Sequence, residues 1–211
     1  KAAAALTIQT CKRAAMSTLI ARRFAPVLFI GSCAISAHAA DDGLRTAVML
    51  DHAYDVHANQ IYARMSGRDL KLDVYAPSTK PVVPVPVLIN IHGGGWVAGS
   101  REGKALTALP YMQMGFTVVN IEYRLSKDAL APAAVEDALC ALQWVGRNAK
   151  RYNFDLGKVV VSGDSAGGHL ALTTGMIKSD SEFTTQCAAN EPTWSGPYVN
   201  AAPKVAAVIN W

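Results

Sequence analysis

One serine in this sequence lies in a pattern typical of a nucleophile. Ser165 is the centre of GDSAG (residues 163–167), between the β-branched run VVV (159–161) and a run of helix-forming residues. A serine hydroxyl attacks a carbonyl only when a base takes its proton and when the side chain projects freely. A sharp strand-to-helix turn projects it, and Gly163 and Gly167 keep that turn free of colliding side chains. The pattern predicts that Ser165 is a nucleophile on a strained turn.

A glycine-rich turn before a helix is also typical of a phosphate-binding loop, since the helix N-terminus attracts anions. The spacings of the phosphate-binding and dinucleotide-binding motifs are absent around residues 163–168. We therefore favour the nucleophile over the phosphate site.

A second glycine cluster, HGGGW (residues 92–96), follows an apolar run and supplies what acyl transfer needs next. Negative charge builds on the carbonyl oxygen during the attack, and fixed backbone N–H groups stabilise it. Glycines let the backbone approach closely, so this loop is a candidate oxyanion hole. His92 precedes the glycines, and we interpret it as a structural residue that holds the loop rather than as the base.

Strands and helices alternate around these two clusters. Continuous apolar strands that alternate with helices predict an α/β domain, a mostly parallel sheet with helices on both faces. The helix after Pro132 should bury Val135 and Leu139 and expose Gln143. Residues 41–67 are expected to be irregular and residues 178–203 to form a polar loop. The expected strands are 70–77, 87–95, 116–123, 158–163 and 204–211, and the expected helices are 104–114, 132–150 and 166–176.

Four segments together resemble the α/β-hydrolase fold: HGGGW (92–96), EYRL (122–125), PAAVEDALCALQWV (132–145) and GDSAGGHLAL (163–172). They are similar to esterases and lipases of the hormone-sensitive-lipase-like group and, more closely, to BD-FAE-like carboxylesterases. The resemblance implies that Ser165 is the nucleophile. It implies an oxyanion hole made by the N–H groups of Gly94, Gly95 and Ala166, with Gly93 shaping the loop.

The resemblance also implies an activity and a substrate class. Such enzymes hydrolyse short-chain carboxylic esters, and some act on acetylated or feruloylated polysaccharides, with no cofactor and no metal. A peptidase or amidase on the same fold, or a non-catalytic binding protein, stays open as an alternative. The binding protein is disfavoured because such proteins commonly lose the serine or a glycine of the turn.

The sequence departs from the family at the catalytic acid and base, which in this fold follow the serine. His169, the histidine downstream of Ser165, lies within the predicted helix, and we do not expect it to reach the hydroxyl. Asp164 is interpreted as a turn residue. Asp180, Glu182 and Glu191 come too early for the acid. We expect residues 41–211 to be the N-terminal two-thirds of one domain, incomplete at its C-terminus and inactive alone.

The first forty residues predict export. Residues 16–40 contain a basic start, an apolar stretch and an Ala-His-Ala pattern, typical of a signal peptide cleaved after Ala39 or Ala40. A lipoprotein signal around Cys33 is the less favoured alternative, and residues 1–15 are expected to be upstream translated sequence. The mature protein should then be periplasmic or secreted, with no stable membrane span.

The remaining charge and the cysteines exclude other classes of function. Beyond residue 40 the chain carries 15 basic and 16 acidic residues, so no basic excess favours nucleic acid. The sequence contains no CxxC motif and no Cys/His cluster, so it does not predict a metal site. Export would permit a disulfide between Cys140 and Cys187, and two unpaired buried thiols are the alternative.

Overall fold

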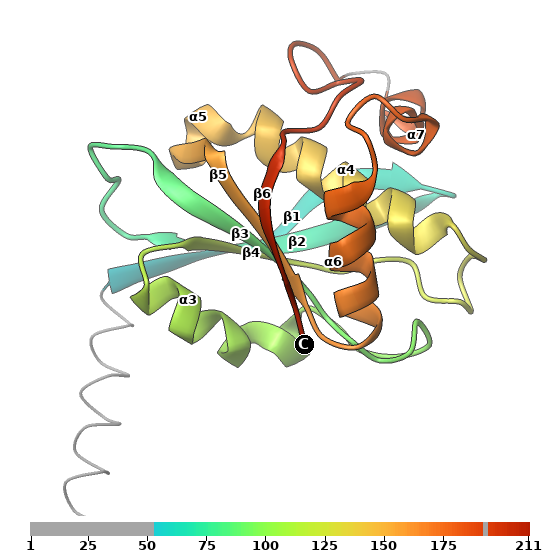
Figure 1. Ribbon diagram of the computed structural model, residues 1–211, viewed down its shortest axis with the longest axis horizontal. Helices are drawn as coiled ribbons and strands as arrows, with labels where there is room; N and C mark the ends of the chain where they lie inside the picture. The colour runs from blue at the N-terminus through green and yellow to red at the C-terminus, as the bar shows by residue number, and fades with distance from the viewer. Residues whose placement is uncertain (1–52, 192–193) are drawn as a thin grey trace, which may run out of the picture. The chain divides into compact units, whose positions relative to one another are not determined.

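Six strands form one mixed sheet in the order β1-β2-β4-β3-β5-β6. The computed structural model describes residues 53–191 and 194–211, so the predicted signal peptide lies outside the described residues. Three neighbouring pairs, β4–β3, β3–β5 and β5–β6, are parallel, whereas β1 and β2 run antiparallel at one edge (Figure 1). The strands are β1 (Tyr54–Met65), β2 (Arg68–Pro77), β3 (Val85–Ile91), β4 (Thr117–Ile121), β5 (Phe154–Gly163) and β6 (Val205–Asn210).

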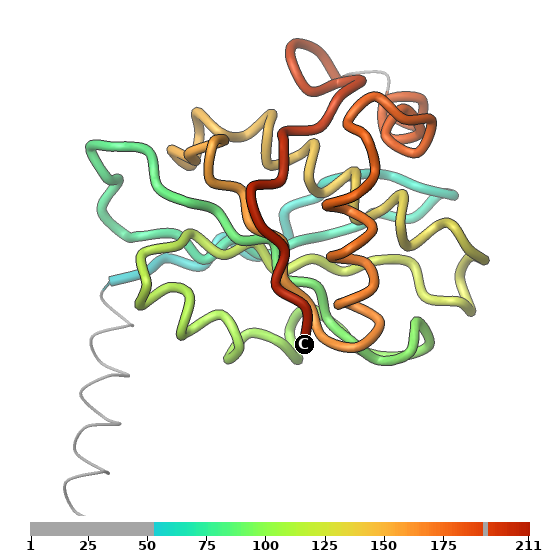
Figure 2. The backbone as a smooth tube through the Cα atoms, viewed as in Figure 1, coloured from blue at the N-terminus to red at the C-terminus, as the bar shows by residue number. Residues whose placement is uncertain are grey.

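Helices cover both faces of the sheet, as predicted (Figures 1 and 2). The 3₁₀ helix η1 (Glu102–Ala108) and α3 (Leu109–Gln113) cover one face, over Leu88, Val118 and Val160. The helices α4 (Ala133–Arg147) and α6 (Ala166–Met176) lie on the other face, where the larger apolar core forms. The strands need this double cover because apolar side chains on both of their faces are buried.

The parallel register brings the two glycine clusters together. Ile91, the last residue of β3, pairs with Gly163, the last residue of β5. Gly163 pairs in turn with Asn210 at the end of β6. Because the carboxyl ends of parallel strands share one edge of a sheet, the loops that follow β3 and β5 begin side by side.

Two segments expected to be irregular contain regular structure. Residues 54–65 form β1, which pairs with β2 through a two-residue turn at Ser66 and Gly67, both with positive φ. Residues 178–203 contain the helix α7 (Glu182–Asn190). A further short helix, α5 (Ala149–Tyr152), lies earlier in the chain, between α4 and β5. Both expectations of irregular structure were therefore wrong.

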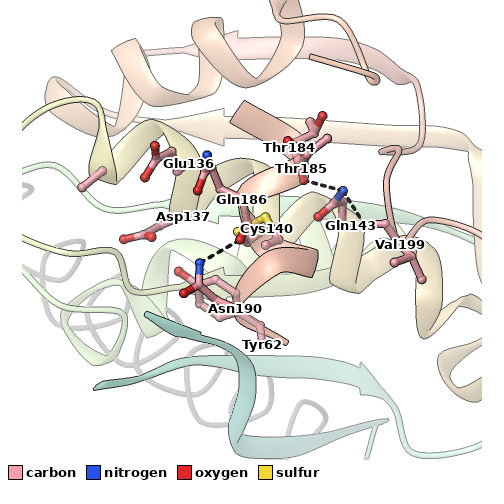
Figure 3. The surroundings of a disulfide bond; sticks show 12 residues. Tyr62, Glu136, Asp137, Cys140, Gln143, Thr184, Thr185, Gln186, Asn190 and Val199 are labelled. Carbon is pink, nitrogen blue, oxygen red and sulfur yellow. Dashed lines mark hydrogen bonds between the residues drawn. A yellow bond between two sulfur atoms is a disulfide. The ribbon is translucent and has the colours of Figure 1, made fainter. Parts of the chain in front are cut away.

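The expected polar face of α4 was also wrong in one place. Gln143 is fully buried, and its amide Nε2 donates to the carbonyl oxygens of Thr184 at 2.9 Å and Val199 at 3.2 Å (Figure 3). One turn earlier on the same helix, Cys140 forms a disulfide with Cys187 of α7. The segment around α7 covers this face of α4, which is why a polar side chain there is not exposed.

In the part of the chain that the structure describes, no helix has both the length and the apolar character needed to cross a membrane.

Candidate active site

Ser165 lies on a strained turn between β5 and α6. Its backbone has φ 52° and ψ −117°, a region that non-glycine residues rarely adopt. The surroundings hold this conformation: the Ser165 N–H donates to the Trp211 carbonyl at 3.0 Å, and the Ser165 carbonyl accepts the His169 N–H at 3.0 Å. The side chain is exposed. The turn therefore presents the hydroxyl to solvent at the carboxyl edge of the sheet.

The glycines on either side of Ser165 are required by close backbone contacts. A Cβ atom on Gly163 would lie 2.3 Å from the carbonyl oxygen of Gly167. A Cβ atom on Gly167 would lie 2.2 Å from the carbonyl oxygen of Ile91. Neither acceptor is on a side chain that could move aside, so the turn closes only with glycine at both positions.

The loop after β3 carries N–H groups that the rest of the described chain leaves free. Gly94 and Gly95 have φ of 122° and 60°, and a Cβ atom on Gly94 would lie 2.1 Å from the Ala98 carbonyl oxygen. Within residues 53–191 and 194–211, the N–H groups of Gly94, Gly95 and Ala166 have no hydrogen-bond acceptor. Backbone donors without an acceptor, at a strand edge and at a helix N-terminus, are suited to an anion.

His92 is placed as a support for this loop. Its side chain is buried, its ring stacks on Tyr123 with centroids 4.3 Å apart, and its Nδ1 lies 2.8 Å from the Gly93 carbonyl oxygen. Because a carbonyl oxygen only accepts, Nδ1 carries the proton. The Tyr123 hydroxyl donates to the His92 carbonyl at 3.1 Å. Burial lowers the pKa of His92. Burial and the charge of Asp164 raise the pKa of Tyr123 to about 12.

His169 is brought near the loop without reaching the serine hydroxyl. It is exposed, and its ring meets the ring of Trp96 edge to face, with centroids 5.4 Å apart. Among the described residues, no side chain forms a hydrogen bond with the Ser165 hydroxyl. Glu191 is buried and pairs with Arg64 at 3.4 Å, so it is engaged elsewhere.

A largely apolar cavity of about 400 Å³ adjoins the glycine loop. Gly95 belongs to both the loop and the cavity wall, and Trp96 and His169 form part of that wall. The cation in the wall, Arg124, is held by the carboxylate of the buried Asp137. The residues that line the cavity are Gly95, Trp96, Arg124, Ser126, Ala129, Ala131, Pro132, Ala134, Val135, His169 and Leu170.

The sequence did not indicate Lys104 as a residue of this site, and it indicated Asp164 only as a turn residue. Asp164 accepts a hydrogen bond from the Gly93 N–H at 3.2 Å, so it does more than complete a turn. Lys104 of η1 forms an ion pair with Asp164, with Nζ 2.7 Å from Oδ1. Only Asp164 carries a local signal, its place beside Ser165; Lys104 carries none, because it lies 60 positions away. Across the described residues, no group of three or more His, Cys, Asp or Glu side chains is arranged to hold a metal ion.

Two curated esterases are similar in sequence to this chain. Esterase LipC of Mycobacterium tuberculosis is 32% identical over 116 residues, which cover 54% of this chain and 29% of LipC. Carboxylesterase NlhH of the same organism is 35% identical over 115 residues, covering 53% of this chain and 35% of NlhH. The chain therefore spans about a third of the length of these curated relatives.

Solved structures show the same fold over a larger share of the chain. A thermophilic esterase of Thermogutta terrifontis, Est2, matches with a TM-score of 0.61 and 27% identity, covering 75% of this chain and 52% of Est2. Est2 with propionate bound matches with a TM-score of 0.60 and 27% identity, over 75% and 54% of the two chains. The predicted α/β-hydrolase fold is confirmed. The BD-FAE family model matches residues 72–211, and this chain belongs to that family.

Proposed function

We propose that this chain supplies the nucleophile and the oxyanion hole of a serine carboxylesterase. The observation that carries the proposal is the exposed, strained Ser165 beside three backbone N–H groups that have no acceptor in the described residues. The names of LipC and NlhH support an ester as the substrate. No step of this chemistry calls for a cofactor.

The proposed reaction passes through an acyl-serine intermediate. The Ser165 oxygen attacks the ester carbonyl as a base takes its proton, and the N–H groups of Gly94, Gly95 and Ala166 receive the charge on the carbonyl oxygen. The tetrahedral intermediate collapses to the acyl-serine, and the alcohol leaves with the proton that the base had taken. Water then attacks the acyl-serine, which releases the acid and restores the serine. No described histidine is placed to serve as the base, so we propose that the acid and the base belong to a longer protein and that residues 41–211 alone are inactive.

The apolar cavity supports an ester with a short acyl group. Its wall is built largely from small side chains, including Ala129, Ala131 and Ala134, and it begins at Gly95, one of the proposed donors. Propionate, a short acyl group, is bound in a solved structure of Est2. We therefore propose that the acyl group lies between Trp96 and Leu170. We propose acetyl or feruloyl esters on polysaccharides as further candidate substrates.

We also propose that the mature protein is exported. The signal pattern of residues 16–40 supports this, and so does the Cys140–Cys187 disulfide, since disulfides persist in oxidising compartments. N-terminal sequencing of the mature protein tests the proposal. A chain that begins near Asp41 is expected, and a retained residue 16 contradicts it.

The enzymatic proposal is tested with the full-length protein and a series of p-nitrophenyl esters of increasing acyl length. Ser165→Ala is expected to lower kcat by about 10⁴-fold or more, because the nucleophile is lost. Ser179→Ala, an exposed serine outside the site, is the matched control. Retained turnover by Ser165→Ala contradicts the mechanism, and turnover by residues 41–211 contradicts the proposed missing base. Faster hydrolysis of a matched amide favours the amidase instead.

The acyl cavity is tested with Ala129→Leu in the same protein. Added methyl groups should reduce kcat/KM for the longer acyl esters and leave the acetyl ester little changed. A change that follows the alcohol of the ester rather than its acyl group would place the alcohol in this cavity.

A further inference from the structure

Asp164 joins the serine turn to the glycine loop. Its Oδ1 accepts the Gly93 N–H at 3.2 Å, and its main-chain oxygen accepts the Gly167 N–H at 2.8 Å. A Cβ atom on Gly93 would lie 2.5 Å from Oδ2 of the same carboxylate, so the side chain lies directly against the loop. The carboxylate thereby fixes the position of the loop relative to Ser165.

The negative charge of the Asp164 carboxylate is unfavourable for the proposed reaction. Gly94 follows the residue that Asp164 binds, and Ala166 lies two positions after Asp164, so a negative charge stands beside the proposed oxyanion hole. A nearby carboxylate raises the energy of a developing oxyanion. Its field reaches other groups at this edge, since it contributes to the raised pKa of Tyr123 and counteracts the lowering of the pKa of His92.

Lys104 is placed to cancel that charge. Its Nζ lies 2.7 Å from Oδ1 of Asp164, the same oxygen that holds Gly93. The side chains of Lys104 and Asp164 are 27% and 38% exposed, so solvent screens the pair in part. At His92 the two charges act in opposite directions on the pKa, because Asp164 raises it and Lys104 lowers it.

We propose that Lys104 is a positioning residue for ester hydrolysis, whose ammonium group neutralises the carboxylate of Asp164 while that carboxylate anchors Gly93. The inference rests on the proposed function. It assigns a task in the reaction to a residue of η1, on the opposite face of the sheet from α6 (Figure 1).

Four forms of the full-length protein test it: wild type, Lys104→Met, Asp164→Asn and the double variant. Lys104→Met leaves the carboxylate unneutralised, and we expect kcat to fall about tenfold while KM stays within about twofold. Asp164→Asn keeps an oxygen acceptor for Gly93 and removes the charge, so a fall of about threefold is expected. The kcat of the double variant should equal that of Asp164→Asn and should therefore be higher than that of Lys104→Met.

The matched control is Lys158→Met, which breaks an exposed ion pair of 3.0 Å with Asp155 on β5. It should leave kcat unchanged. Thermal unfolding of every variant separates loss of fold from loss of rate, and Asp164→Ala, which removes the acceptor, should be slower than Asp164→Asn.

The outcomes separate this inference from the proposed function. An inactive wild type, or an active Ser165→Ala, overturns the esterase and this inference with it. If both behave as proposed but the effects of Lys104→Met and Asp164→Asn on kcat multiply in the double variant, the two residues act independently and only this inference fails. An unchanged kcat in Lys104→Met overturns it as well.

Discussion

The serine turn before α6 and the helix α7 after it differ in how their polar groups are bonded. At its N-terminus, Ser165 is strained and exposed, and neighbouring backbone N–H groups lack acceptors among the described residues. Where the chain continues beyond α6, α7 is fastened to α4 by a disulfide and by a buried glutamine that bonds two carbonyl groups (Figure 3). In Figure 1 the turn that precedes α6 lies at the lower end of the parallel strands, near the C-terminus, and α7 lies at their upper end.

We interpret the difference as a division between a region proposed for chemistry and a region that stabilises the fold. An active site needs free donors and an exposed nucleophile, which lower stability unless other parts of the fold compensate. The α7 region has a covalent link and a buried glutamine that donates to two carbonyl groups, and none of its residues lines the cavity beside Gly95. Changes at the serine turn should therefore alter activity and folding together, whereas changes at α7 should alter stability alone.

At the serine turn, Gly167→Ala is expected to lower activity and stability together, the largest combined effect in this comparison. The new Cβ would lie 2.2 Å from the backbone oxygen of Ile91, so either the turn or the end of β3 must shift. We expect the free energy of unfolding to fall by about 3 kcal/mol. We expect kcat to fall at least about 100-fold, because the serine and the oxyanion loop lose their register. Denaturant unfolding and ester turnover of the full-length protein measure both.

Gly168→Ala is the matched control for that change. Its Cβ would meet the amide oxygen of Asn210 at 1.9 Å, and this acceptor ends an exposed side chain that can rotate away. A stability loss below about 1 kcal/mol is expected. Equal losses in the two variants would contradict the claim that backbone contacts fix the turn.

The next effect belongs to the other region: the double variant Cys140→Ala, Cys187→Ala. The disulfide closes a loop with a sequence separation of 47 residues. Loop-closure entropy of that size corresponds to about 4 kcal/mol of stability. Urea unfolding should show the loss, while kcat under folding conditions stays at the wild-type value. A reduced kcat in folded protein would mean that α7 and the serine turn are coupled.

A smaller effect is expected from Gln143→Leu. The substitution removes two hydrogen bonds to the carbonyls of Thr184 and Val199, and it also removes a buried amide oxygen that has no partner. A net loss of about 1–2 kcal/mol in unfolding free energy is expected, with kcat unchanged. Gln186→Ala, at an exposed position on α7, should leave both quantities unchanged.

The smallest effect is the dependence of stability on pH through His92. Burial lowers the pKa of His92 below its ordinary value of 6.5, so the unfolded chain binds this proton more readily than the folded chain. The neutral ring thus stabilises the fold above pH 6.5, and this contribution is lost as the pH falls through the lowered pKa. His92→Phe, which keeps an aromatic ring beside Tyr123, should lose less stability than wild type between pH 7.5 and 5. Parallel pH profiles of urea unfolding would contradict this.

Local sequence predicted the centre of the fold well. The central strands are apolar runs, and α6 begins directly after the glycine-flanked serine and spans Ala166–Met176 as expected. The strand β1 was missed because most of its side chains are at least partly exposed, so its alternation is weak. The pair Ser66–Gly67 was the available signal, since two residues with positive φ are typical of a tight hairpin turn.

The sequence by itself indicated the serine turn, because its two glycines lie only two positions from Ser165 and an apolar strand precedes it. The glycine run at residues 93–95 was readable for the same reason. Only the tertiary structure decided the rest. The pairing of Cys140 with Cys187, the stack of His92 on Tyr123 and the contact of Lys104 with Asp164 join residues 31 to 60 positions apart. Such contacts depend on how the sheet brings separate loops to one edge, and no local pattern records that.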